Sequence, residues 1–507
     1  MARHLLGEMR EKINRKVSAL TTKTLFRDKL NNWLGYLSIA ALACIFGLLI
    51  SKDLASGLAF FVAIVGFVAL VIFLKDPEVC FYFFLFFAFL IYWFNSAFFH
   101  GDFPVGLVYD ILAIVMLLGL SLSRPDFRIT LKYFNKIPLV TYFFVILFFN
   151  VVEMFNPNSG GASATNITGF RKFLDFIIIL FAAYNLFDSM EKIKKFSNML
   201  LIAAGISAIY GCIQQWFGLM PWELESILSN PIAFGLLFVN GEFRKFGTMS
   251  DPSIYGLLMT GCTLYYFILG IYEKNKKWRA AYIIGAIFML LAVGYSGTRT
   301  AYATMLAGLG FFILLNIDKP AIQKLGIASV IGFLILMYGP FQGIGTVRRF
   351  RSTFIGTQDQ SYKVRLEARA FIQPYVRSHP IGGGLGTTGF NGAKEHPGHP
   401  LANFQPDGSY VVKATETGWV GLILVCILYF MVMRTGIRGF FHARSPEVKV
   451  YYGACLAAIF SFYVGEYTQL AVGGVTDSLV YFPLIAIMLN LKYFDTDAEP
   501  RHPEIGI

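Results

Sequence analysis

Long apolar runs recur along nearly the whole of this 507-residue chain. A helix needs about 20 apolar residues to cross roughly 30 Å of hydrocarbon. About fourteen runs approach or meet this length, which predicts an all-α polytopic membrane protein with about 12 to 14 transmembrane helices. The expected spans are residues 33–50, 54–74, 79–99, 105–122, 137–152, 170–187, 196–219, 254–271, 281–296, 301–315, 325–339, 414–433, 450–470 and 478–491.

Composition excludes the main soluble classes. Hydrophobic residues make up 56% of the chain and charged residues 15%, against about 25% charged residues in soluble domains. The 52 phenylalanines and 26 tyrosines exclude disorder, because a disordered chain carries few aromatic residues. All six cysteines lie inside apolar runs, where thiols behave as small hydrophobes. We therefore expect neither a disulfide scaffold nor a zinc site.

The distribution of positive charge predicts the orientation of the chain in the membrane. The formal net charge is +12, and cytoplasmic connections are expected to be the basic ones. This pattern predicts cytoplasmic termini and explains most of the charge without a nucleic-acid partner. The basic connections are residues 1–32, 123–136, 192–195, 273–279 and 434–449.

These spans and connections divide the chain into five parts. The first part is a basic cytoplasmic arm (residues 1–32), and it is followed by roughly the first eleven transmembrane helices (residues 33–339). A large extracytoplasmic loop (residues 340–412), roughly the twelfth to fourteenth helices (residues 413–491) and a cytoplasmic tail (residues 492–507) complete the chain. The arm has no apolar core followed by a small-residue cleavage site, so we do not expect a cleaved signal peptide. Its basic residues favour contact with anionic membrane lipid.

The large loop is an exception to the expectation that basic connections are cytoplasmic. It is rich in arginine and lysine although it is expected outside the cytoplasm. Arginine pairs bidentately with phosphate and stays charged at any relevant pH. The loop therefore favours a phosphorylated ligand, such as a lipid-linked pyrophosphate whose head lies at headgroup depth. The alternative is that the arginines pair with carboxylates or lipid phosphates and only fix orientation. The external cations are Arg171, Lys172, Arg244, Lys245, Arg299, Arg348, Arg349, Arg351, Lys363, Arg365, Arg369, Arg377 and Lys394.

Other polar features have simpler interpretations. The Gly384–Gly389 stretch matches a dinucleotide fingerprint, but it opens no soluble βαβ unit and is better explained as a tight turn. His396 and His399 lack the partners of a zinc site, so no metal is expected. Three acidic residues lie inside expected spans, where a proton relay and structural pairing are the alternatives, and pairing is favoured. These residues are Asp110, Asp175 and Glu466.

Four stretches, in this order, resemble the O-antigen ligase and O-antigen polymerase superfamily of bacterial polysaccharide assembly. Residues 244–253 are similar to the family's external Arg, Gly and Pro-Asn element, and residues 296–301 resemble its Ser-x-Ser-Arg signature. Residues 365–369 running into 379–386 resemble an Arg-rich helix followed by a Pro-Leu-x-Gly-x-Gly turn. Residues 407–410 leading into 416–422 are similar to the His-Asn-x-x-Leu and Glu-x-Gly-x-x-Gly element. The resemblance covers about residues 171–433.

The resemblance implies a membrane glycosyltransferase with a GT-C-like bundle in the bacterial cytoplasmic (inner) membrane. Its donor would be a glycan on undecaprenyl pyrophosphate, its reaction would invert the anomeric carbon, and it would use neither metal nor cofactor. Arginines would take the place of the metal by stabilising the leaving pyrophosphate. On this basis we expect pyrophosphate contacts from Arg299, Arg365 and Arg244, with Arg369 and Arg171 behind them.

The identity of the catalytic base stays open. Where the ligases carry a His before Asn, this chain has Asp407 before Gly408. Asp407 is a candidate base or orienter, although Pro-Asp-Gly is also a common turn sequence. Glu416 is a second candidate base, with helix packing as its alternative. His396 and His399 are further candidates, and departure of the leaving group with little help from a base is another alternative.

Three functions fit these observations. The first is a polysaccharide polymerase, which the missing His favours; flippase and chain-length regulator proteins would be its assembly partners. The second is a ligase that moves the finished chain to a different acceptor. The third is a transporter or flippase for the same lipid-linked glycan, which the large external loop argues against, since alternating access requires a site near the bilayer midplane.

Overall fold

The computed structural model describes residues 33–52, 54–99, 101, 103–160, 164–239, 241–341, 343–354 and 360–496. The predicted basic arm and residues 497–507 of the predicted tail lie outside the described residues. The chain divides into two compact units. The first comprises Met1–Phe84 and Ile111–Thr130, and the second comprises Leu85–Asp110 and Leu131–Ile507.

The described residues confirm the prediction of an all-α polytopic membrane protein. They contain nine helices long and apolar enough to span a membrane, or ten if α7 (Phe127–Phe134) and α8 (Pro138–Glu153), bent by 82°, form one span. Each predicted segment except 414–433 lies largely on a single helix, but several of these helices are shorter than a full span. The strands among the described residues are β1 (Phe238–Val239) and β2 (Glu242–Phe243), which pair antiparallel.

The first unit is built around α3 (Trp33–Lys52) and α4 (Leu54–Lys75), with the first part of α5 (Pro77–Phe99) and the last part of α6 (Val105–Ser123). The Ser123 hydroxyl donates to the carbonyls of Leu74 and Lys75 at 2.7 and 2.9 Å. Gly119 allows α6 to pack closely on α4, because a Cβ there would lie 2.7 Å from the Phe73 carbonyl oxygen. Small residues of this kind let membrane helices approach closely.

The core of the second unit consists of α13 (Pro252–Tyr272), α22 (Pro446–Gly465) and α23 (Val475–Asn490), which are largely buried. Glycines bring its helices together: Gly261 lies against the Phe462 ring, and Gly308 lies against Leu264 and the Ala457 carbonyl. The remaining helices are α9 (Ala164–Leu186), α10 (Met190–Phe217), α11 (Pro221–Leu228), α12 (Pro231–Leu237), α14 (Lys276–Ser296), α15 (Arg299–Leu315), α16 (Pro320–Tyr338), α17 (Gly345–Phe354), α18 (Gln360–Ser378), α19 (Gly389–Glu395), α20 (Ser409–Glu416) and α21 (Gly418–His442).

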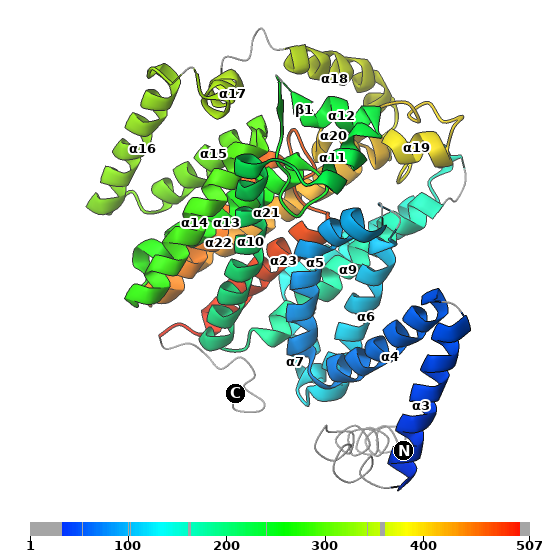
Figure 1. Cartoon of the computed structure of the whole chain (residues 1–507). Helices are drawn as coiled ribbons and strands as arrows, with labels where there is room; N and C mark the ends of the chain where they lie inside the picture. Colours follow the sequence, from blue (N-terminus) through cyan, green and yellow to red (C-terminus); the bar gives the residue numbers. More distant parts are fainter. Residues whose placement is uncertain are drawn as a thin grey trace. The chain divides into compact units, whose positions relative to one another are not determined.

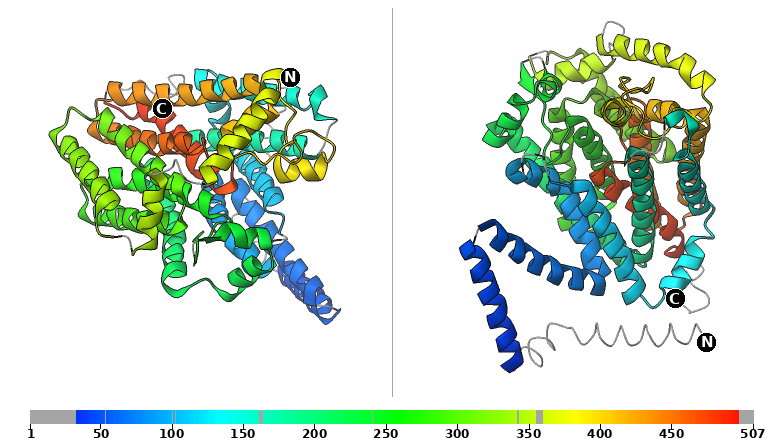
Figure 2. Two further views of the ribbon diagram at one scale, coloured as in Figure 1. Left: turned by 90° about the horizontal axis from the view of Figure 1, so that it is seen from above. Right: turned by 90° about the vertical axis from the view of Figure 1, so that its right-hand side faces the viewer.

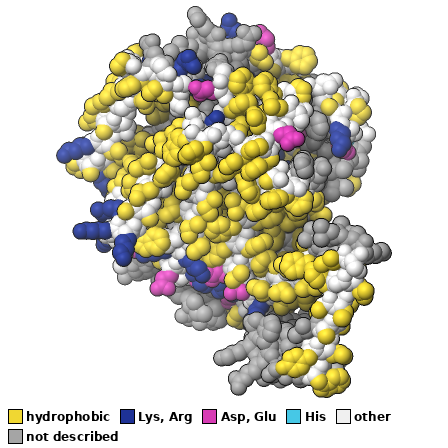
Figure 3. All heavy atoms as spheres, viewed as in Figure 1, with side chains coloured by type: hydrophobic (Ala, Val, Ile, Leu, Met, Phe, Trp, Pro, Cys, Tyr) yellow, Lys and Arg dark blue, Asp and Glu magenta, His cyan; other side chains and the backbone are white. Residues whose placement is uncertain are grey.

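The short helices and the strand pair gather at one end of the second unit. Figure 1 shows α11, α12, α17, α18 and α20 at this end, and the right-hand view of Figure 2 also places α18 there. The predicted large loop forms α17, α18 and α19, and the predicted span 414–433 is interrupted between α20 and α21. The end predicted to be extracytoplasmic therefore has a folded cap. Figure 3 shows hydrophobic side chains over much of one face of this unit, with lysines and arginines near its lower-left margin.

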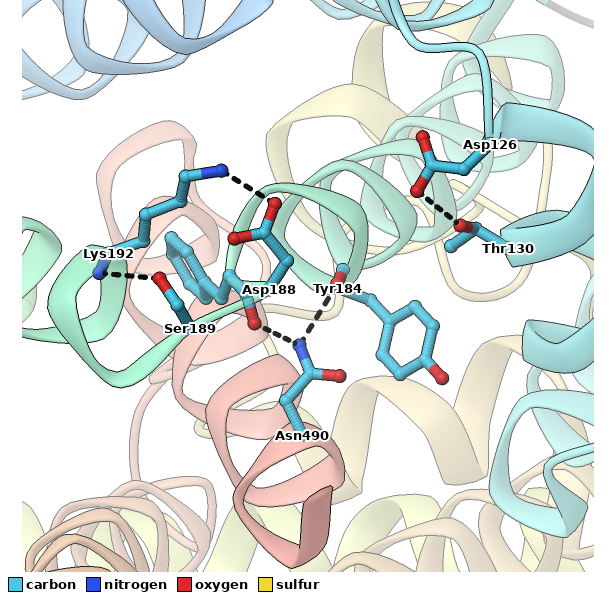
Figure 4. Close-up of polar contacts among 8 residues, drawn as sticks. Asp126, Thr130, Tyr184, Asp188, Ser189, Lys192 and Asn490 are labelled. Atoms are coloured by element: carbon cyan, nitrogen blue, oxygen red, sulfur yellow. Dashed lines mark hydrogen bonds and ion pairs between the residues drawn. The ribbon is translucent and has the colours of Figure 1, made fainter. Parts of the chain in front are cut away.

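Polar side chains fix the turn between α9 and α10 (Figure 4). The Asn490 amide at the end of α23 donates to the carbonyls of Tyr184 and Phe187 at 2.9 and 3.0 Å. Ser189 caps α10, and Lys192 pairs with Asp188 at 2.6 Å. A separate contact in the first unit joins Thr130 to Asp126 at 3.2 Å. Each of these contacts satisfies a polar group close to a helix end.

Candidate functional site

Arg244 joins the first two sequence motifs, residues 244–253 and residues 296–301, by hydrogen bonds. Its Nε donates to the Ser296 carbonyl at 3.1 Å, and its Nη2 donates to Thr298 Oγ1 at 2.8 Å and Ser253 Oγ at 3.3 Å. The Thr298 hydroxyl in turn donates to the Pro252 carbonyl at 2.8 Å. The guanidinium is therefore held by several groups from both motifs, which fixes its position before any ligand binds.

Local capping explains why both motifs form turns at helix ends. Asp251 is the N-cap of α13 and accepts from the backbone N–H groups of Ser253 and Ile254 at 2.6 and 3.1 Å. Pro252 occupies the first helical turn, where its missing N–H costs nothing. Gly297 ends α14 in the left-handed conformation with φ 58°. This turn places Arg299 at the beginning of α15.

A buried hydrogen-bond network centred on Gln214 holds the loop that carries Arg244. Gln214 Oε1 accepts from the Gly247 N–H at 2.9 Å, and Gln214 Nε2 donates to Glu223 Oε1 at 2.8 Å. Tyr210 donates to the same Glu223 oxygen at 3.0 Å. Burial raises the pKa of Glu223 above its ordinary value. Gln214 and Glu223 are positioning residues that no local sequence motif had indicated.

Four arginines from separate segments form an electrostatically coupled group, which we call the arginine cluster: Arg244, Arg299, Arg349 and Arg365. Burial, and then repulsion from Arg349, lowers the pKa of Arg244 to about 10, so the side chain stays charged at neutral pH. Arg299 experiences repulsion from Arg365 and Arg349. Among the described residues, no carboxylate lies within salt-bridge distance of Arg244 or Arg349. The cluster is therefore suited to an anion from outside the protein.

The three arginines of α17 have different environments. Arg349 belongs to the arginine cluster and, with Arg348 and Arg244, lines a small pocket that also contains Glu242. Arg351 donates from Nε to the Leu336 carbonyl at 2.8 Å and from Nη2 to the Gly339 carbonyl. Arg351 therefore caps the end of α16 through backbone carbonyls rather than through the carboxylates or lipid phosphates considered from the sequence.

Backbone hydrogen bonds join the glycine-rich turn of the third motif (residues 379–386) to the fourth motif (residues 407–410 and 416–422). The N–H groups of Gly383 and Gly384 donate to the carbonyls of Thr415 and Glu416 at 2.9 and 2.8 Å. Gly418 has φ 66°, and a Cβ there would lie 1.9 Å from the Pro380 carbonyl oxygen. Any residue with a side chain would clash, so the approach of the two segments requires glycine. The turn predicted at Gly384–Gly389 is confirmed.

Asp407 lies beside the arginine cluster. Its Oδ2 is 3.6 Å from Arg365 Nε. The next residue, Gly408, packs so closely that a Cβ would lie 2.6 Å from the Tyr467 carbonyl oxygen. Arg369 donates to that carbonyl at 2.9 Å and lies 4.2 Å from the Tyr467 ring centroid. The structure therefore places Asp407 and Arg365 together and uses Arg369 to hold the neighbouring turn.

Glu466 organises this turn. Its Oε1 accepts from the N–H groups of Ala471 and Val472, both at 2.7 Å, and its Oε2 accepts from the Tyr429 hydroxyl at 3.1 Å. These contacts favour a structural role for Glu466 over a proton relay. Two residues on, Thr468 Oγ1 lies 2.5 Å from Thr300 Oγ1 at the start of α15. This hydrogen bond joins the Glu466 turn to the segment that carries Arg299.

The remaining predicted site residues lie elsewhere in the same unit. Arg171 Nη1 pairs with Asp110 Oδ2 at 2.9 Å, so the structure does not bring Arg171 into the arginine cluster. Glu416 accepts from Thr388 Oγ1 at 2.6 Å. His396 and His399 are neighbours, with ring centroids 6.5 Å apart. His399 Nε2 bonds to the Asn158 carbonyl at 2.9 Å and its Nδ1 accepts from the Leu401 N–H at 3.1 Å.

These contacts engage both ring nitrogens of His399, and burial lowers its pKa below the ordinary value. Its environment therefore fits a structural histidine better than a base. Several contributors to the site were not predicted from the sequence, namely Gln214, Glu223 and Tyr467. Arg349 was visible in the run Arg348-Arg349-Phe350-Arg351, but nothing in the run distinguished it from its neighbours.

A bundle of membrane-length helices with a group of arginines in the cap at one end defines a polytopic membrane protein. Residues 284–426 match the family model described as O-antigen ligase. The match confirms the resemblance expected from the sequence, lies inside the predicted core of 171–433, and supports a glycan-processing membrane enzyme of O-antigen assembly. No curated protein matches the chain. The matched segment contains Arg299, Arg349, Arg365 and Asp407.

Proposed function

We propose that this protein is a polysaccharide polymerase. It transfers a growing glycan from undecaprenyl pyrophosphate to a lipid-linked repeat unit, at the outer face of the bacterial inner membrane and with both termini in the cytoplasm. The carrying observation is the arginine cluster, in which Arg244 and Arg349 have no carboxylate within salt-bridge distance among the described residues. A pyrophosphate supplies the missing negative charge.

The reaction follows from this arrangement without a metal. An acceptor hydroxyl attacks the anomeric carbon, the bond from that carbon to the pyrophosphate oxygen breaks, and the pyrophosphate leaves with added negative charge. Preorganised guanidinium groups stabilise that charge most strongly in the transition state. Asp407, next to Arg365, is placed to accept the hydroxyl proton, and Glu416 is the second candidate.

A ligase is the second candidate function, and the description of the matching family favours it. Both reactions use the same donor and the same leaving group, so the arginine cluster serves either. The residue before Gly408 favours the polymerase, because the chain has Asp407 where the ligases carry a His. Flippase and chain-length regulator proteins are the proposed assembly partners in either case.

The test is the size distribution of lipid-linked and surface glycan in a deletion strain. The strain is complemented with wild type, with Asp407→Ala, or with Arg434→Ala as a control at the predicted cytoplasmic end. Accumulation of single repeat units and loss of long polymer identifies a polymerase. Accumulation of long chains on the lipid carrier identifies a ligase and overturns the proposal.

A further inference from the structure

A large cavity lies beside the arginine cluster in the second unit. Its volume is about 590 Å³, within the roughly 300–1,000 Å³ of ligand pockets. Most of its wall is apolar and comes from α8, α9, α21 and α23, and its polar residues come both from these helices and from the cap. The apolar lining includes Phe143, Phe149, Phe173, Phe176, Val425 and Phe482.

Two lysines line this cavity, and the Asp110 carboxylate attracts one of them, Lys172, from beyond salt-bridge distance. Lys172 and Lys413 repel each other, and among the described residues neither has a carboxylate within salt-bridge distance. Arg171, the neighbour of Lys172, is already paired with Asp110 at 2.9 Å. Glu416 also lines the cavity, but its Oε1 accepts from Thr388. The two lysines therefore provide a second place for an anion, separate from the arginine cluster.

A carboxylate oxygen in the same cavity lacks a hydrogen-bond donor. Asp477 is 2% exposed, and its Oδ2 accepts from the Gly474 N–H at 3.0 Å. Its Oδ1 has no hydrogen-bond partner among the residues that the structure describes. Leaving such a buried acceptor unsatisfied is unfavourable, so a ligand hydroxyl is well suited to fill this position. The cavity thus combines apolar walls, a pair of cations and a hydrogen-bond acceptor.

The cavity and the arginine cluster meet at consecutive residues. Ser253 accepts from Arg244 Nη2 at 3.3 Å, and the next residue, Ile254, lines the cavity. Asp407 pairs with Arg365, and Pro406 before it and Ser409 after it line the cavity. Asp407 therefore lies at the boundary between the two regions, where it can accept the proton of an acceptor hydroxyl as that hydroxyl attacks the donor.

We propose that this cavity binds the acceptor, a lipid-linked sugar phosphate, while the arginine cluster holds the donor pyrophosphate. The lipid chain packs on the apolar wall, the phosphate pairs with Lys172 and Lys413, and a sugar hydroxyl donates to Asp477. This assignment rests on the proposed function and makes it more specific, since the acceptor is itself an anionic lipid. A bulk phospholipid shares the chain and the phosphate but not the sugar.

The test is the binding stoichiometry of a fluorescent polyprenyl pyrophosphate sugar on the purified full-length protein. We expect two sites in the wild type. The double variant Lys172→Gln, Lys413→Gln should weaken one site by about tenfold or more, and Arg244→Ala should weaken the other. Val425→Trp, which fills the cavity, should also remove the first site. Ile427→Trp is the matched control, because Ile427 is 40% exposed and does not line the cavity.

The possible outcomes separate the two proposals. If the lysine variant and Val425→Trp leave both sites unchanged, the acceptor assignment is wrong while the arginine site stands. If only Arg244→Ala has no effect on binding, the donor assignment fails while the cavity assignment stands. If phosphatidylglycerol displaces the probe from the cavity at equal concentration, the cavity holds bulk lipid and the acceptor assignment is overturned.

Discussion

The arginine cluster and the lysine pair are two cationic regions of the same unit, but they are built differently. Arg244 is fixed by hydrogen bonds to Ser296, Thr298 and Ser253. Lys172 and Lys413 lie on a largely apolar wall. Arginine in a fixed setting recognises a planar phosphate edge, whereas lysine is a point charge on a flexible stem. The contrast is between a region whose cation is fixed in place and a region whose cations can move, which fits the donor and acceptor assignments we propose.

The largest expected effect is loss of activity when the arginine cluster is broken. Arg299→Ala and Arg244→Ala should each lower turnover by about 100- to 1,000-fold, because each removes a preorganised donor from the leaving group. The measurement is polymer formation from lipid-linked repeat units by protein of equal membrane abundance. Arg434→Ala should retain normal turnover, and equal losses in all three variants would contradict the proposed site.

Exchanging the two kinds of cation sharpens the comparison. Arg244→Lys should lower turnover by about tenfold or more, since lysine cannot reproduce the guanidinium contacts to both motifs. Lys413→Arg should change turnover by less than about threefold, because the cavity needs charge rather than a fixed geometry. The measurement is kcat and KM for the acceptor in both variants. Similar losses in the two variants would show that the regions do not differ as we describe.

A substitution where the turn at Pro380 packs against Gly418 should change stability by an intermediate amount. Gly418→Ala should destabilise the protein by about 1–3 kcal/mol or more, because it combines φ 66° with a clash against the Pro380 carbonyl. The measurement is thermal unfolding in detergent. Gly310→Ala on α15 is the control, since no atom lies within 4 Å of its Cβ and a helical alanine is favourable. If the Gly418→Ala variant unfolded at the wild-type temperature, the close packing of Gly418 on the Pro380 carbonyl would be refuted as a constraint on stability.

The smallest expected effect concerns pH and the turn around His399. Its lowered pKa means that the folded state binds a proton less tightly than the unfolded state. The stability contribution is therefore fully present above the ordinary value of 6.5 and is lost as pH falls from 6.5 through the lowered pKa. Thermal unfolding at about pH 7.5 and about pH 5.5 measures it. In His399→Gln this part of the pH dependence should disappear, and an unchanged difference would exclude His399 as its source.

The predicted site residues differ in how far the sequence could place them. Arg244 and Arg299 were predictable because each lies in a motif at a helix end. Arg171 was grouped with them by its expected side of the membrane, but tertiary packing pairs it with Asp110 at 2.9 Å. Its neighbour Lys172 lines the cavity instead. Position along the chain predicts the depth of a residue in the membrane, but it does not predict the partner that its side chain meets.

The sequence alone determined the all-α membrane class, the positions of most long apolar helices and the four motifs, but not the helices of the cap. These are local properties, since apolar length specifies a span and capping residues specify its ends. Tertiary structure decided which arginines converge, that Glu466 holds a turn, and that Asp407 lies between the arginine cluster and the cavity. These are contacts between segments far apart in sequence, and they depend on how the helices pack, which a single sequence leaves open.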